Sequence, residues 1–175
     1  MERIFGPVMQ NAFVVADLRA ALDHWTRVMA VGPFYLFEHI EFEEVSFRGN
    51  SIKDLQFSVA IGYWGDIQIE LIQQRNAVPS IYTEFMASGR QGMQHMGVVT
   101  ESLDRDLARL APLGVTPVQH GRTATGLRFA YVSTDFHPGG MIELIEAHAP
   151  TLGFFEMMRR EARGWDGRDP LRPVG

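Results

Sequence analysis

Two stretches of the sequence, "DIQIELIQQ" at residues 66–74 and "GGMIELIEA" at residues 139–147, share the core Ile-Glu-Leu-Ile. In a β-strand successive side chains point to opposite faces, so the residues flanking each Glu share one face and the Glu lies on the other. The two carboxylates are Glu70 and Glu143. This repetition predicts two strands that each bury an aliphatic face and turn a Glu toward a common site.

The segments around these strands also repeat. "VMQNAFVV" at 8–15 reads as a strand, and the helical spacing of "LRAALDHWTRVM" at 18–29 follows an N-cap at Asp17. The second pass opens with the strand "MQHMGVV" at 93–99 and continues with the helical "SLDRDLARLAPLG" at 102–114. Each helix is followed by several strand-like runs, so the order strand, helix, strands occurs twice.

This order predicts an α+β fold in which two paired βαβββ modules form a cup-shaped mixed sheet, with a helix on the outer side of each half and a further C-terminal helix. We expect one domain over residues 1–148, made of module 1 (5–75), a linker (76–91) with a short helix, and module 2 (92–148). Residues 149–175 are expected to form the C-terminal helix and a tail whose last ten residues are irregular.

The opening strands add a second pair of polar residues. When "QNAFVVADL" and "HMGVVTESL" are aligned on the leucines that begin the helices, Gln10 matches His95. Alignment on the Val-Val pairs would instead match Asn11 with His95, and that choice would reverse the face. We prefer the first register because it also aligns the helix starts.

With that register each module contributes one residue from its first strand and one Glu from its last. The four side chains are Gln10, Glu70, His95 and Glu143. One imidazole, one amide oxygen and two carboxylates suit a divalent ion, with Zn²⁺, Ni²⁺, Co²⁺, Mn²⁺ or Fe²⁺ all compatible. The four residues are therefore predicted to ligate a metal that keeps open positions for water or substrate.

The composition limits the class of partner. A net charge of −5 argues against nucleic acid, and Lys53 is the only lysine of the 175 residues. No apolar run approaches the roughly 18 residues of a membrane span, and the N-terminus lacks the pattern of a secretory signal. The chain has no cysteine, which excludes disulfides and thiolate ligands. A cytoplasmic protein without a membrane or nucleic-acid partner is expected.

Four motifs, "QNAFVVADLRAALDHW", "IELIQ", "HMGVVTESLDRDLARL" and "MIELIE", resemble the vicinal oxygen chelate superfamily of the glyoxalase and bleomycin-resistance type, over residues 5–147. The resemblance implies paired βαβββ modules, a homodimer, and a divalent metal held at Gln10, Glu70, His95 and Glu143. Such a ligand set looks like that of zinc-type glyoxalase I. The run "FAYVSTDFHPGGMIELIE" is similar to the closing segment of methylmalonyl-CoA epimerases, although those enzymes have a longer turn and commonly carry Gln where Glu70 stands.

These residues predict an isomerase, epimerase or lyase that removes a proton next to a metal-bound carbonyl, acting on a small molecule with an enolisable carbonyl. Glu143 is the first choice for the base and Glu70 the second. Two alternatives remain: a non-catalytic small-molecule (drug) binding protein, and a ring-cleaving dioxygenase of the same fold. The second is disfavoured because oxygen-activating iron sites commonly use two His and one carboxylate, whereas the predicted set has one His and two carboxylates.

Other side chains are weaker candidates. The turn residue His137, the cations Arg122 and Arg128, and one Glu of the run "HIEFEEV" could face the site, although a surface position is the simpler expectation for most of them. Five aromatic residues could line a pocket: Phe34, Phe57, Trp64, Phe129 and Tyr131.

Overall fold

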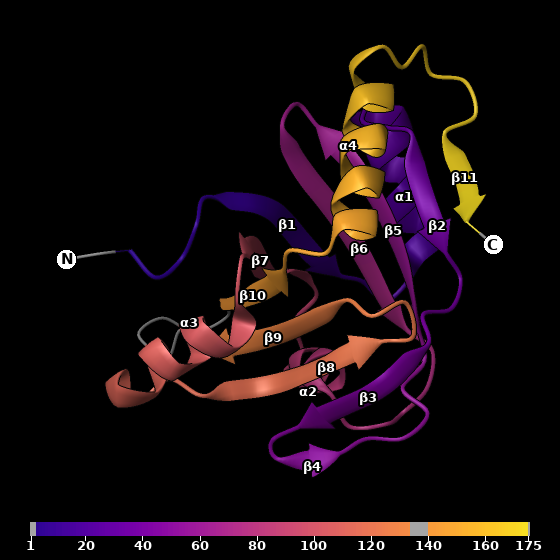
Figure 1. The fold of residues 1–175 in the computed structure, drawn as a ribbon. Coiled ribbons are helices and arrows are strands. Elements are labelled where there is room, and N and C mark those ends of the chain that lie inside the picture. Colours follow the sequence, from indigo (N-terminus) through magenta and orange to yellow (C-terminus); the bar gives the residue numbers. More distant parts are fainter. Residues whose placement is uncertain (1–2, 134–139, 175) are drawn as a thin grey trace.

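The computed structural model describes residues 3–133 and 140–174, which form one eleven-stranded mixed sheet with helices on both of its faces (Figure 1). The α+β class and the C-terminal helix are as predicted. The strands are β1 (Val8–Val14), β2 (Phe34–Phe37), β3 (Phe42–Phe47), β4 (Asn50–Ser51), β5 (Phe57–Trp64), β6 (Ile67–Gln74), β7 (Gly92–Thr100), β8 (Pro117–Thr123), β9 (Arg128–Ser133), β10 (Met141–Glu146) and β11 (Leu171–Val174). The helices are α1 (Leu18–Asp23), continued by the π-helical turn η1 (His24–Val28), α2 (Ile81–Ala87), α3 (Leu103–Leu110), continued by the 3₁₀ turn η2 (Ala111–Leu113), and α4 (Ala149–Arg163).

The sheet has the order β11-β2-β5-β6-β1-β7-β10-β9-β8-β3-β4, so the first strands of the two repeats, β1 and β7, meet at its centre. They run antiparallel, with Asn11 opposite Met96. On either side of that pair Gln10 lies opposite Gly97 and His95 lies opposite Ala12. In the flanking parallel pairs Ala12 lies beside Glu70 and Gly97 lies beside Glu143, so Ala12 and Gly97 are equivalent positions. Gln10 and His95, two residues before them, are equivalent in turn, which agrees with the preferred register and not with the one that matched Asn11 with His95.

The module helices cover the outer face of the sheet, as their apolar spacing predicts. In the first half Leu18 and Leu22 of α1 pack with Ile69 and Leu71 of β6, and Asp17 caps the helix by accepting a hydrogen bond from Ala20 N at 3.0 Å. In the second half the buried leucines of α3 pack against Ile142 and Leu144 of β10. The aliphatic residues on either side of each Glu thus lie under a helix, leaving the Glu on the inner face.

The C-terminal helix lies on the opposite side of the first half from α1, so it occupies the inside of the cup (Figure 1). Its Phe154, Phe155 and Met158 belong to the inner core together with Tyr35 and Ile61. Helix α4 narrows the space enclosed by the sheet and supplies part of its wall.

The hairpin β3–β4 belongs to the first repeat in sequence but extends the second half in space. β3 pairs antiparallel with β8, Val45 lying opposite Gly121. The chain between β2 and β3, residues 38–41, therefore crosses from one half of the sheet to the other. A hydrogen bond from Ala124 N to the Glu41 carbonyl oxygen (2.8 Å) fixes the far end of this crossing.

The expectation of an irregular C-terminal tail is wrong for residues 171–174, which form the edge strand β11, parallel to β2. The segment is short and contains Pro173, which lacks a backbone donor, so its sequence carries little strand signal. An edge position tolerates such a residue because only one side of the strand must pair. No helix among residues 3–133 and 140–174 has the length and apolar character needed to cross a membrane.

Candidate metal centre

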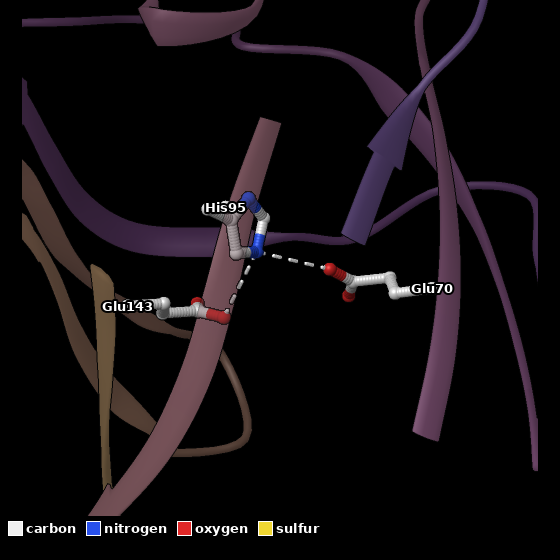
Figure 2. A group of neighbouring side chains, drawn as sticks. All are labelled: Glu70, His95 and Glu143. Carbon is white, nitrogen blue, oxygen red and sulfur yellow. Dashed lines mark ion pairs between the residues drawn. The ribbon is translucent and has the colours of Figure 1, made fainter. Parts of the chain in front are cut away.

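Three strands near the centre of the sheet bring Glu70 of β6, His95 of β7 and Glu143 of β10 to one point on the inner face (Figure 2). The Nε2 atom of His95 lies 3.4 Å from Oε2 of Glu70 and 3.4 Å from Oε2 of Glu143. The three atoms lie within 4.8 Å of one another. The side chains are 0%, 12% and 10% exposed for His95, Glu70 and Glu143, so the cluster is nearly shielded from bulk water.

Strand pairing explains this convergence. In the parallel pairs beside the sheet centre, Glu70 neighbours Ala12 and Glu143 neighbours Gly97, so each carboxylate lies next to a small residue. Gly97 also gives space to Gln10: a Cβ on this glycine would lie only 3.0 and 3.1 Å from Cβ and Cδ of Gln10. Small residues at these two equivalent positions leave room for the longer polar side chains to meet.

The orientation of the Gln10 amide is fixed by a buried chain of hydrogen bonds. Its Nε2 donates to Oε1 of Gln68 at 2.7 Å, and Nε2 of Gln68 donates to the Tyr63 hydroxyl at 3.0 Å. The amide nitrogen is thereby engaged on one side, and the Oε1 atom of Gln10 is left as a free acceptor.

The His95 ring is held in a similar way. Its Nδ1 lies 2.7 Å from Oε1 of Gln94, which can only accept, so Nδ1 carries the proton and donates. The ring also meets Tyr131 edge to face at a centroid distance of 5.0 Å. Nε2 is therefore directed at the two carboxylates, with its lone pair available when the ring is neutral.

Three buried atoms of this cluster have no hydrogen-bond partner among the described residues: Gln10 Oε1, Glu70 Oε2 and His95 Nε2. A buried polar atom without a partner costs about 1–3 kcal/mol, so three in one place require an explanation. All three can donate an electron pair to a cation, and Glu143 adds a second carboxylate. The set fits a divalent ion of the borderline or hard kind.

The electrostatics of the cluster also indicate a site for positive charge. Burial lowers the pKa of His95, but the carboxylates of Glu143 and Glu70, each 3.4 Å from its Nε2, together outweigh burial and raise this pKa to about 9. Burial raises the pKa of Glu70, with a further contribution from the charge of Glu143 and an opposing one from His95. Without a metal, the proton on His95 supplies the positive charge that the two carboxylates require.

Metal binding is therefore expected to displace a proton. With a His95 pKa of about 9, the metal-free ring is protonated at neutral pH, and a ligating ring must be neutral. The apparent metal affinity should rise about tenfold per pH unit up to about pH 9 and then level off. Titration calorimetry in two buffers of different ionisation enthalpy counts the protons released; we expect about one per metal from His95. If none is released at pH 7, or if His95→Gln releases as many, His95 is not the displaced acid.

A cavity of about 610 Å³ lies over this cluster, and Gln10, Glu70 and Glu143 form part of its lining. Of the five predicted pocket aromatics, Phe57, Phe129 and Tyr131 line it. The other two predictions are wrong. Phe34 faces the outer core under α1, and Trp64 is 56% exposed and meets Trp25 edge to face. Both residues lie on the strand positions that point away from the cup.

Most of the charged residues that were weaker candidates lie outside the cavity lining. Arg128 pairs with Asp104 at 2.6 Å and with Glu146 at 3.2 Å, and Arg122 pairs with Glu43 at 3.6 Å, all outside the cavity lining. Of the acidic run, Glu41 lines the cavity. His137 lies outside the described residues.

Sequence reasoning missed the residues that position the ligands. Gln68 shares a face with Glu70 by strand alternation, so its place on the inner side was foreseeable although its bond to Gln10 was not. Gln94, next to His95 in sequence, and Tyr82, whose hydroxyl lies 3.0 Å from that of Tyr131, carried no pattern that distinguished them. Their roles depend on side-chain directions that only the folded sheet defines.

Gly97→Ala should weaken metal binding without unfolding the protein. The added methyl group would overlap the Gln10 side chain and displace its Oε1 from the cluster. We expect at least a tenfold loss of metal affinity, measured by competition with a chromogenic chelator. Gly153→Ala in α4 is the matched control, because a Cβ at that position meets nothing within 4 Å. Equal affinities in both variants would show that the Gln10 position is irrelevant to the metal.

Comparison with known families gives one match by sequence profile. Residues 9–131 match the Glyoxalase/Bleomycin resistance protein/Dioxygenase superfamily. Among curated individual proteins, none matches the sequence significantly. The profile covers β1 to β9 and so includes most of both repeats.

Similar solved structures agree in fold. Methylmalonyl-CoA epimerase from Mycobacterium tuberculosis superposes with a TM-score of 0.60 at 20% identity, over 86% of this chain and 93% of that one. A hypothetical protein from Bacillus halodurans C-125 gives 0.59 at 15% identity, over 81% and 94%. A Streptomyces coelicolor methylmalonyl-CoA epimerase in complex with 2-nitronate-propionyl-CoA gives 0.53 at 15% identity, over 83% and 96%.

Proposed function

Because the chain belongs to the glyoxalase/bleomycin resistance protein/dioxygenase superfamily, we propose that it is a divalent-metal-dependent enzyme that transfers a proton at the carbon next to a substrate carbonyl. The observation that carries this proposal is the group of buried acceptor atoms on Gln10, Glu70 and His95 that have no hydrogen-bond partner among the described residues. They converge with Glu143 at the base of a cavity large enough for a small molecule.

In this proposal Gln10, Glu70, His95 and Glu143 hold the ion. Such an ion, when bound, withdraws electron density from a carbonyl oxygen and so makes the neighbouring C–H bond more acidic. Gln68 and Gln94 position two of the ligands through the amide and the imidazole that they contact. Their hydrogen bonds leave Oε1 of Gln10 and Nε2 of His95 as the atoms that face the ion.

Glu143 is the proposed base, with Glu70 as the alternative. Oε2 of Glu70 is buried and has no hydrogen-bond partner among the described residues, which suits a ligand that stays bound. Glu143 lines the cavity and is free in this scheme to leave the ion. The C–H bond breaks, its proton passes to the Glu143 carboxylate, and the electron pair moves to the carbonyl oxygen. Return of the proton to the opposite face gives epimerisation, and return to the neighbouring carbon gives isomerisation. Lyase chemistry would begin with the same proton removal.

The two solved epimerases described above supply a second line of support, because their names place proton transfer beside a thioester carbonyl on this fold. Their identities of 20% and 15% leave the substrate of the present chain open. A cytoplasmic location and a homodimer are also part of the proposal, and light scattering of the purified protein tests the latter.

Deuterium exchange tests the proposed reaction. The purified protein, loaded in turn with Zn²⁺, Ni²⁺, Co²⁺, Mn²⁺ and Fe²⁺, is incubated in D₂O with α-hydroxyketones and acyl thioesters, and loss of the C–H signal is followed by NMR under nitrogen. We expect metal-dependent exchange that EDTA abolishes and that does not need oxygen. Metal binding without exchange of any of these compounds would count against an enolising enzyme, and a requirement for oxygen would favour the dioxygenase alternative.

A further inference from the structure

The cavity above the candidate metal centre combines an aromatic wall with exclusively acidic formal charges, and from this combination we infer the class of its ligand. We propose that it takes an uncharged, ring-bearing carbonyl compound, and not a carboxylate or an acyl group attached to an anionic carrier. The reaction of this ligand rests on the proposed function. The class of ligand is inferred from the lining of the cavity alone.

The wall of the cavity is made largely of phenylalanine rings drawn from strands and from α4. Six line it: Phe37, Phe42, Phe57, Phe129, Phe154 and Phe155. They contact one another around the wall, with centroid distances of 5.5 Å for Phe42 and Phe57 and 5.8 Å for Phe37 and Phe154. Rings in a ligand gain apolar burial and edge-to-face contacts from such a surface.

The size of the cavity supports the same conclusion. A volume of about 610 Å³ lies within the 300–1,000 Å³ range of pockets that enclose drug-sized ligands. A four-carbon acyl group would leave much of the phenylalanine surface in contact with water. A compound with two or more rings would instead cover that surface while its carbonyl reached Glu70 and Glu143.

Charge then separates neutral ligands from anionic ones. Three glutamates line the cavity, Glu41, Glu70 and Glu143, and a divalent ion would neutralise the charge of only two of them. No Lys or Arg is found among the described residues of the lining, and residues 134–139, which lie outside the description, contain neither in their sequence. An anionic group placed here would lose its hydration without gaining a paired cation.

Two imidazoles and one helix end are the remaining electropositive groups of the lining. His39 is exposed, and His148 has its Nδ1 2.9 Å from the Thr151 hydroxyl at the start of α4. Pro150 occupies the first turn of that helix and so removes one backbone donor. These groups can hydrogen-bond to a hydroxyl or a carbonyl of a neutral compound. None of them is a guanidinium group, which could pair with a carboxylate or a phosphate.

A matched pair of probes tests the ligand class. Benzoin is a neutral two-ring α-hydroxyketone, and its para-carboxylate derivative differs by one negative charge. Both are placed together in equilibrium dialysis against the Mn²⁺-loaded protein and against EDTA-treated protein, and the bound ratio is read by chromatography. We expect benzoin to be enriched at least tenfold over the carboxylate on both forms, and methylmalonyl-CoA to displace neither.

A pair of charge-reversal variants assigns the selectivity to the cavity. Glu41→Lys places a cation in the lining and should raise the share of the carboxylate probe at least threefold. Glu43→Lys makes the same change two residues further along the chain, but Glu43 faces Arg122 outside the lining, so the bound ratio should stay as in the unmodified protein. A shift of equal size in both variants would assign the selectivity to general surface charge and overturn the inference.

The outcomes for ligand and reaction can be told apart because each probe is also followed for exchange in D₂O. Enrichment of benzoin with exchange of its C–H proton supports both proposals. Enrichment without exchange of this or any other compound supports the ligand class and makes the protein a binding module. The ligand class is overturned by any of three results: preference for the carboxylate, exchange of methylmalonyl-CoA, or binding of neither benzoin probe. If methylmalonyl-CoA exchanges, the proposed reaction nevertheless stands.

Discussion

Glu143→Gln is expected to lower the rate of substrate C–H exchange by about 10²–10⁴-fold, the range attributed to a positioned general base. The substitution keeps the shape of the side chain and an oxygen that can still ligate, but it removes the group that accepts the proton. Because the amide is a weaker ligand than the carboxylate, the comparison must be made at saturating metal. Exchange rates by NMR, together with metal content measured by atomic emission, separate loss of the base from loss of the ion.

Two further variants make this result interpretable. Glu101→Gln is the control, since that side chain is 87% exposed and lies outside the cavity lining, and its rate should equal that of the unmodified protein. Glu70→Gln should reduce metal affinity more than Glu143→Gln does if Glu70 is the ligand that stays bound. If Glu143→Gln exchanges at the original rate and Glu70→Gln does not, the two roles are reversed.

Phe34→Ala is expected to lower the free energy of unfolding by about 3–5 kcal/mol, the usual cost of removing a phenyl ring from a core. Phe34 is fully buried in the outer core between α1 and the sheet, where it packs with Leu18 and Leu22. Its ring lies directly over Gly62, where a Cβ would be 3.0 Å from the ring carbons. Gly62 has no side chain of its own that could move into the space that the substitution would leave.

Urea unfolding followed by far-UV circular dichroism measures this effect. EDTA must be present throughout, because an ion that binds only the folded protein would add to the apparent stability. Val28→Ala, at a side chain 68% exposed, should change the free energy by less than about 0.5 kcal/mol. A loss of under 1 kcal/mol for Phe34→Ala would mean that the outer core is packed differently from this description.

The candidate cluster was predictable because two simple regularities act together. Strand alternation placed Glu70 and Glu143 on the face away from the buried aliphatic residues, and the repeat paired Gln10 with His95. Neither regularity depends on distant parts of the chain. The described structure brings Glu70, His95 and Glu143 together and places Gln10 with the two glutamates in the lining of one cavity. Their role as metal ligands stays a prediction that the metal titrations above decide.

Other features depend on contacts between residues far apart in sequence. Strand alternation could not show that β3 pairs with β8, because strand pairing partners are not encoded in the pattern of one strand. The sequence also left undecided on which side of the sheet α4 packs, since its apolar stripe would fit either face. Trp64 could not be assigned from residue type either: a strand that is buried along most of its length ends in this exposed ring.

Because β3 and β4 cross over to pair beside β8, each half of the sheet contains strands from the first repeat. Residues 42–51 belong to the first repeat by sequence, but they form the last two strands of the second half of the sheet. Neither repeat is therefore a self-contained half that could be separated by cutting the chain between them. Severing it there would leave the C-terminal piece with a bare strand edge and would divide the four polar side chains between two incomplete fragments.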